Sequence, residues 1–216
     1  VMLSAFNMVG RFLWASTSDF IGRKNTYFCF FVLGAILYSS IPYFALEASA
    51  NPSTVIYFAG FCIATMIIFT MYGGGFATIP AYLADIFGTM HVGGIHGRLL
   101  TAWSTAGVLG PVSILQLRDF SRLNAINDLV SKIDPQAFLD KFGAPVEQLE
   151  QLVSAKTVTI ARLMEIVPAG TIDPTPSLYN TTMYAMAGLL VIAFFANLFM
   201  KPVDKSHHFK GDPSKQ

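Results

Sequence analysis

An arginine lies inside the first apolar stretch of the chain, at Arg11. A charged side chain in the hydrocarbon of a bilayer is costly unless it faces protein, water or a counter-ion. A guanidinium in such a place offers charge-assisted pairing with a carboxylate, from either a neighbouring side chain or a passing solute. Arg11 is therefore the first candidate binding residue, and the alternative is that it serves only the charged turn that follows it.

The charged turn contains Asp19, Gly22, Arg23 and Lys24. Near the start of a helix, the partial positive charge of unpaired N–H groups stabilises an aspartate. A glycine permits a tight reversal of the chain, and adjacent basic residues bind lipid headgroups. A generic loop at the membrane edge explains the two bases, but it does not explain Arg11.

Two histidines, His91 and His96, lie between apolar stretches, together with Asp85 and Arg98. Histidine changes its charge near neutral pH, so these residues are candidates for proton coupling, with Asp85 as a carboxylate partner. The alternative is that both histidines are interfacial loop residues without a chemical role.

No part of the sequence shows a pattern typical of an enzyme or a metal site. The polar side chains in the apolar stretches are mainly Arg11, serines and threonines. These stretches contain no paired acids, no histidine cluster and no nucleophile beside its base. Cys29 and Cys62 both lie in apolar stretches and predict neither a disulfide framework nor a zinc site. We therefore expect no catalysis, no cofactor and no metal, and the net charge of +1 gives no reason to expect nucleic-acid binding.

The elements that carry these residues must cross a membrane. Of 216 residues, 53% are hydrophobic and only 12% are charged, whereas charged residues make up about a quarter of a soluble domain. A spanning helix needs about 20 apolar residues, and the second to fifth apolar runs are long enough, while the first is slightly short. The runs are 1–16, 27–46, 55–80, 99–117 and 179–200. The sequence thus predicts an all-α membrane protein with five transmembrane helices.

Lysine and arginine are concentrated at one set of ends of these runs, after the first, before the fourth and after the fifth. The positive-inside rule places those ends and the carboxyl terminus in the cytoplasm. The polar block 118–178, with apolar residues at helical spacing, then lies outside as a helical loop that caps the outer face. We expect residues 1–117 to form four spans, residues 179–200 the fifth, and residues 201–216 a cytoplasmic tail.

Residues 10–24 read GRFLWASTSDFIGRK and resemble the signature loop of the major facilitator superfamily, in the copy between its eighth and ninth helices. Ala15 stands where that loop usually has a glycine. Residues 72–88, 97–103 and 107–111 are similar to the oxalate/formate antiporter family of that superfamily. The resemblance implies that the five spans are helices eight to twelve, the carboxyl-terminal half of a twelve-helix transporter in the plasma (inner) membrane.

The resemblance also implies a role for the charged turn. In that superfamily, the aspartate and the bases of this loop form a latch that holds the cytoplasmic ends of the two halves in one conformation. The corresponding residues here are Asp19, Arg23 and Lys24, with Gly22 at the reversal.

Family members that carry carboxylates place two cations, from the eighth and eleventh helices, beside the substrate in an aromatic cage. Arg11 matches the first position, while the second falls at Trp103, which carries no charge. Because two buried carboxylates need two counter-charges, a substrate with one carboxylate, such as formate, pyruvate or lactate, is favoured over oxalate. Arg11 would pair with it between apolar walls supplied by Tyr72 and Trp103. The alternative is that both aromatic residues only pack between helices.

The resemblance therefore implies a secondary active transporter that moves a small organic anion by alternating access. Its partners would be the carboxylate substrate, the lipid bilayer and the amino-terminal half of the same transporter. The glycines at 73–75 are open to a second interpretation as tight helix packing, and those at 107 and 110 as a helix kink. The alternative function is a membrane receptor or sensor whose outer block binds a ligand.

Overall fold

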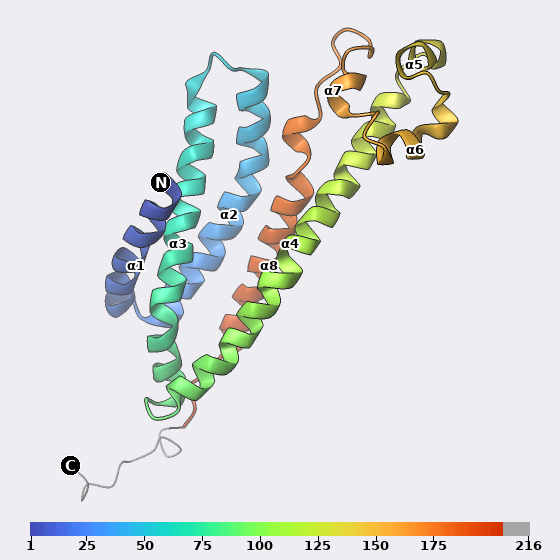
Figure 1. Ribbon diagram of the computed structural model, residues 1–216. Coiled ribbons are helices and arrows are strands. Elements are labelled where there is room, and N and C mark those ends of the chain that lie inside the picture. Colours follow the sequence, from blue (N-terminus) through green and yellow to red (C-terminus); the bar gives the residue numbers. More distant parts are fainter. Residues whose placement is uncertain (205–216) are drawn as a thin grey trace, which may run out of the picture. The chain divides into compact units, whose positions relative to one another are not determined.

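The computed structural model describes residues 1–204, and these residues form helices and contain no strand (Figure 1). The long helices are α1 (Met2–Ile21), α2 (Arg23–Ala50), α3 (Val55–Phe87), α4 (Val92–Val130) and α8 (Asn180–Phe199). The short ones are α5 (Pro135–Phe142), α6 (Leu149–Ser154) and α7 (Ile160–Leu163), with 3₁₀ turns at Val146–Gln148 and Thr175–Ser177. The prediction of an all-α fold is confirmed. Most of the predicted tail 201–216 lies outside the described residues.

Within residues 1–204, four helical segments are long and apolar enough to span a membrane: Arg23–Ala50, Val55–Phe87, Val92–Val130 and Thr175–Phe199. They confirm the prediction of a membrane protein and contain the second to fourth apolar runs and nearly all of the fifth. Helix α1 forms over the first run but is not among them, because Arg11, Asp19 and several hydroxyl side chains lower its hydropathy. The first of the five predicted spans therefore stays a prediction.

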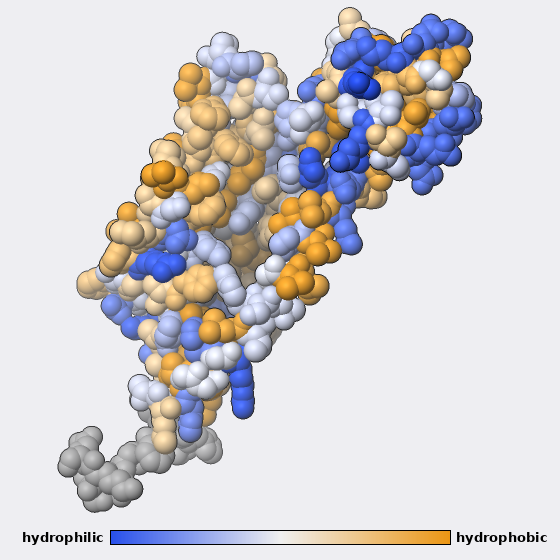
Figure 2. All heavy atoms as spheres, in the orientation of Figure 1, coloured by the Kyte–Doolittle hydropathy of each residue, from blue (hydrophilic) through white to orange (hydrophobic). Residues whose placement is uncertain are grey.

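The chain divides into two compact units. The first contains residues 1–111 and resumes at Met183, and in it α3 packs against both α1 and α2 (Figure 1). Helix α8 packs along α2, where the ring centroids of Phe28 and Phe194 are 4.9 Å apart. Large apolar side chains cover much of the outside of α1–α3 (Figure 2), which suits a surface in contact with lipid tails.

Helices α1 and α3 approach each other closely because glycines lie at their contact. A Cβ atom at Gly10 would overlap the backbone of Thr70, and one at Gly73 would overlap the backbone of Asn7. At the same interface, Trp14 Nε1 donates a hydrogen bond of 3.2 Å to Thr70 Oγ1. Small residues of this kind let membrane helices associate through van der Waals contact. Tight packing between helices therefore accounts for Gly73.

The second unit, residues 112–182, has an apolar core of its own. Its most deeply buried side chains are those of Ile126, Leu129, Phe138, Val158 and Leu163. Hydrophilic residues gather over the surface of α5–α7 (Figure 2), so these short helices are amphipathic, as their spacing predicts. Phe120 and Leu123, two of the apolar residues at helical spacing in the block 118–178, are instead exposed.

Helix α4 continues without a break through Arg118, where the sequence predicts the end of a span. Its 39 residues correspond to about 58 Å of helix, roughly twice the thickness of the hydrocarbon core. The predicted boundary marks only a change in polarity, and arginine, leucine and alanine beyond it all favour the helical state. Polarity therefore changes along α4 without ending it.

A charged pair supports the second unit. Lys141 donates a hydrogen bond to Glu165 and so ties α5 to the chain after α7. This hydrogen bond and the positive charge of Lys141 lower the pKa of the Glu165 carboxyl below its ordinary value. Because the pKa is lowered in the folded state, the pair stabilises the unit above the carboxyl's ordinary pKa. That contribution is lost as the pH falls through the lowered value.

Replacement of Leu163 by alanine is expected to destabilise the second unit by about 2–5 kcal/mol, because it removes a fully buried side chain and leaves a cavity. Hydrogen exchange of the backbone amides in α5–α7, followed by mass spectrometry, measures this loss. The matched control is Leu139→Ala, since the Leu139 side chain is 38% exposed. Equal exchange in the two variants would contradict the packing described above.

Replacement of Gly73 by alanine is expected to destabilise the first unit by about 1–3 kcal/mol, because the new methyl group forces α1 away from α3. Thermal unfolding in detergent, followed by circular dichroism, measures the change. Gly75→Ala serves as the control, since a Cβ atom there meets nothing within 4 Å. The interface is wrongly described if both substitutions have the same effect.

Candidate functional site

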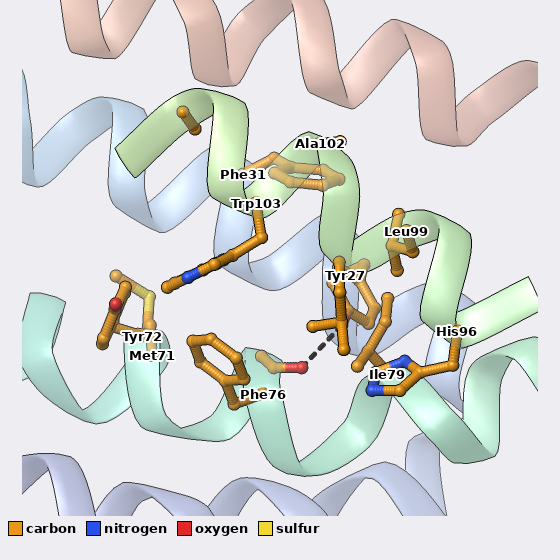
Figure 3. A pocket seen from close by; sticks show the side chains of 13 residues that line it. Tyr27, Phe31, Met71, Tyr72, Phe76, Ile79, His96, Leu99, Ala102 and Trp103 are labelled. Atoms are coloured by element: carbon orange, nitrogen blue, oxygen red, sulfur yellow. Dashed lines mark hydrogen bonds between the residues drawn. The ribbon is translucent and has the colours of Figure 1, made fainter. Parts of the chain in front are cut away.

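A cavity of about 510 Å³ lies between α2, α3 and α4 in the first unit (Figure 3). Its wall is formed by Tyr27 and Phe31 of α2, by Met71, Tyr72, Gly75, Phe76 and Ile79 of α3, and by His96, Leu99, Leu100, Ala102, Trp103 and Ala106 of α4. Two of the three predicted substrate-binding residues, Tyr72 and Trp103, thus line the same cavity. Their side chains are 49% and 46% exposed, so the cavity is open on one side.

Three aromatic rings form one end of this cavity. The centroids of Phe76 and Trp103 are 4.2 Å apart with the planes at 69°, and Tyr72 lies 5.8 Å from Trp103 and 5.6 Å from Phe76. Edge-to-face arrangements of this kind are favourable beyond the area they bury. The rings face one another across the cavity wall (Figure 3), so they present a preformed apolar surface to a ligand.

The cavity contains few polar groups, and among residues 1–204 no Asp, Glu, Lys or Arg side chain lines it. The Tyr27 hydroxyl donates a hydrogen bond of 2.8 Å to the Gly75 carbonyl and is thereby satisfied. His96 lies at the other end from Tyr72 (Figure 3), and its Nδ1 atom is buried without a hydrogen-bond partner among residues 1–204. Buried polar atoms without a partner are uncommon in folded proteins. His96 is therefore a polar side chain of the cavity wall with one nitrogen left without a hydrogen bond, and the Tyr72 hydroxyl is likewise unpartnered within residues 1–204.

Arg11 does not line this cavity. Helix α1 packs against the face of α3 that carries Gly73, whereas Tyr72 and Phe76 point into the cavity from another face of α3. Arg11 is exposed, and within residues 1–204 its guanidinium forms no hydrogen bond or ion pair. The predicted trio is thus divided: two aromatic residues share the cavity, and the role of Arg11 as a carboxylate partner stays a prediction.

The charged turn brings its predicted residues together. Gly22 alone separates α1 from α2, with φ at 85°, a conformation that favours glycine. Arg23 then lies between two carboxylates, 2.6 Å from Asp19 Oδ1 and 3.5 Å from Asp85 Oδ2. Because both carboxylates are more than half exposed, each pair contributes at most about 1 kcal/mol.

The structure thus places Asp85 with the charged turn, and within residues 1–204 no hydrogen bond or ion pair joins it to His91 or His96. His91 is exposed at the start of α4, where its carbonyl accepts a hydrogen bond of 3.0 Å from the Ile95 amide. The three residues that the sequence groups as candidates for proton coupling therefore occupy three different surroundings, and their coupling stays a prediction.

Lys24 joins the ends of two helices. Its ammonium group donates hydrogen bonds to the carbonyls of Leu198 (3.2 Å) and Met200 (2.7 Å) at the end of α8. In return, Asn197 Nδ2 donates to the Lys24 carbonyl at 3.2 Å, and Tyr82 Oη donates to Asn197 Oδ1 at 2.7 Å. Tyr82 and Asn197 are both buried, so this network fixes the ends of α2, α3 and α8.

Neither Tyr82 nor Asn197 is predicted from the sequence as a site residue. A signal was present, because an amide inside an apolar span must find a partner within the protein. Asn197 is such a residue, because it lies within the fifth apolar run. Its partner on another helix has no sequence signature.

No protein-family model, no curated protein and no solved structure matches this chain. The fold and the site therefore define its class: an all-α membrane protein with an aromatic cavity in one unit and a helical second unit.

Replacement of Tyr82 by phenylalanine is expected to destabilise the first unit by about 1–3 kcal/mol, because it leaves the buried Asn197 carbonyl oxygen without its donor. The measurement is thermal unfolding in detergent. Tyr184→Phe removes the same hydroxyl from a residue of α8 that is 54% exposed, and it should change little. A Tyr82→Phe variant as stable as this control would show that the network contributes nothing.

Proposed function

We propose that this chain is the carboxyl-terminal half of a secondary transporter of the major facilitator type that moves a small monocarboxylate by alternating access. The observation that supports it is the aromatic cavity in a bundle of apolar helices, with Tyr72 and Trp103 in its wall. Transporter sites of this kind lie near the bilayer midplane, where two repeats rock about the substrate. No lysine or arginine of the described part of the chain lines the cavity, which favours one carboxylate over two.

Arg11 supplies positive charge outside the cavity in this proposal. Its guanidinium is exposed and unpaired within residues 1–204, beside apolar side chains such as Val9 and Phe12 of the same helix. A cation in such surroundings attracts an anion strongly because little water screens it. Arg11 therefore draws the carboxylate toward the space between this half and the amino-terminal half.

The charged turn acts as the latch. Arg23 holds Asp19 and Asp85 together across the end of α1 and the end of α3, with Lys24 on the end of α8. Ion pairs of about 1 kcal/mol or less break and re-form readily, as a reversible gate requires. The proposal puts this end in the cytoplasm, as the distribution of lysine and arginine favours, and the protein in the plasma (inner) membrane.

A receptor or sensor is the second candidate. It is favoured by one observation, the compact core of residues 112–182, which gives the chain a second folded unit able to present a binding surface. A ligand that binds this unit, with no solute moved across the membrane, would favour the receptor.

Uptake into proteoliposomes of the complete transporter tests the proposal, with labelled lactate, pyruvate, formate and oxalate as solutes. The monocarboxylates are expected to enter, and Arg11→Ala is expected to slow their uptake by about tenfold or more, because it removes the positive charge that attracts the anion. Trp103→Lys, which adds the second cation, is expected to increase oxalate uptake.

Arg122→Ala is the matched control for Arg11→Ala, since Arg122 lies in the second unit, 3.8 Å from Asp119. Strong oxalate transport by the unmutated protein would overturn the assignment of the substrate. Absence of uptake of all four solutes would overturn the proposed function for this class of substrate.

A further inference from the structure

The cavity is large for the smallest monocarboxylates. Its volume of about 510 Å³ falls within the range of about 300–1,000 Å³ that is typical of pockets for drug-sized ligands. A molecule with as few heavy atoms as formate or lactate would leave most of the apolar wall without contacts, and each lost contact forfeits dispersion energy. The size of the cavity therefore favours a ligand with a bulky body.

The chemistry of the wall specifies that body. Phe76, Trp103 and Tyr72 present ring faces and edges at one end, and aliphatic side chains of α3 and α4 complete the wall. Such a surface binds an aromatic or branched aliphatic group, since burial of apolar area stabilises the complex by roughly 25 cal/mol per Å². A hydrated dicarboxylate gains nothing there.

A carboxylate inside this wall needs a partner other than Arg11, which lies outside the cavity. His96 Nδ1 is buried without a partner among residues 1–204. The other titratable groups that line the cavity are the phenols of Tyr27 on α2 and Tyr72 on α3, and the Tyr27 hydroxyl is already engaged by the Gly75 carbonyl. A proton held between a carboxylate and an imidazole makes a pair without net charge, which lowers the cost of burial.

We propose that the cavity binds a monocarboxylate with an aromatic or branched aliphatic body, which lies against Phe76 and Trp103 while its carboxylate shares one proton with His96. The inference rests on the proposed function and names the substrate class of that site. Binding takes up one proton from solution together with the anion. The affinity therefore increases as the pH falls, by up to about tenfold for each pH unit.

Equilibrium dialysis of the full chain in lipid nanodiscs tests the inference, with labelled 3-phenylpropanoate as the probe and empty nanodiscs to correct for uptake by lipid. We expect 3-phenylpropanoate to bind at least about tenfold more tightly than lactate, formate or oxalate, in accordance with the apolar area that it buries. Between pH 7.5 and 6.5, its Kd should fall by up to about tenfold. The neutral amide of the same acid should bind without this pH dependence.

Two kinds of variant locate the ligand. His96→Gln keeps a hydrogen-bonding group but cannot take up the proton, so the pH dependence should disappear, whereas the matched control His91→Gln, at an exposed histidine of the same chain segment, should keep it. Ala102→Phe and Ala106→Phe each fill the cavity from α4 and should weaken binding by more than about tenfold. Circular dichroism checks that each variant is folded.

Equal or tighter binding of formate or oxalate would overturn the inference, and so would a pH dependence that survives in His96→Gln. Unchanged binding in both folded phenylalanine variants, Ala102→Phe and Ala106→Phe, would place the ligand elsewhere and overturn the inference as well. The proposed function is tested separately. Binding of 3-phenylpropanoate without uptake in proteoliposomes would contradict transport alone. Uptake of lactate without binding of 3-phenylpropanoate would contradict this substrate class alone.

Discussion

Polar groups on apolar helices must find partners within the protein, because lipid tails offer none. Many hydroxyl side chains in the first unit donate to carbonyls of their own helix, and several polar groups pair across helices: Trp14 donates to Thr70, Tyr27 to the Gly75 carbonyl and Tyr82 to Asn197. These contacts decide which faces of the helices meet. Against this background Arg11 and His96 stand out, because within residues 1–204 neither the guanidinium nor the His96 Nδ1 atom has a partner.

The architecture could be predicted from the sequence because long apolar runs have few alternatives in a membrane. Four of the five runs form helices long and apolar enough to span it, and the reversal at Gly22 lies where the sequence suggests. The continuation of α4 past Arg118 could not be predicted, because the composition records polarity whereas the helix depends on backbone propensity. The exposure of Phe120 and Leu123 could not be predicted either, since periodicity shows which residues share a helix face but not whether another element packs on that face.

Less of the candidate site could be predicted from the sequence. Tyr72 and Trp103 are predicted through a family resemblance, and they do share a cavity. The position of Phe76 beside them, and of the unpartnered His96 Nδ1 atom, depends on how α3 and α4 are rotated about their axes. The separation of Arg11 from that cavity depends on the glycine contacts between α1 and α3. Residue spacing along a single helix specifies neither how that helix is rotated about its axis nor which other helix it contacts.

The single-residue connection at Gly22 has a mechanical consequence. Helix α1 is joined to α2 by one residue and is held to α3 through backbone contacts at Gly10 and Gly73. Sliding of α1 along α3 would drive backbone atoms into each other, so these two helices shift together. Helix α4, which carries His96 and Trp103, makes no such glycine contact, so its part of the cavity wall is not tied to α1 and α3 in this way.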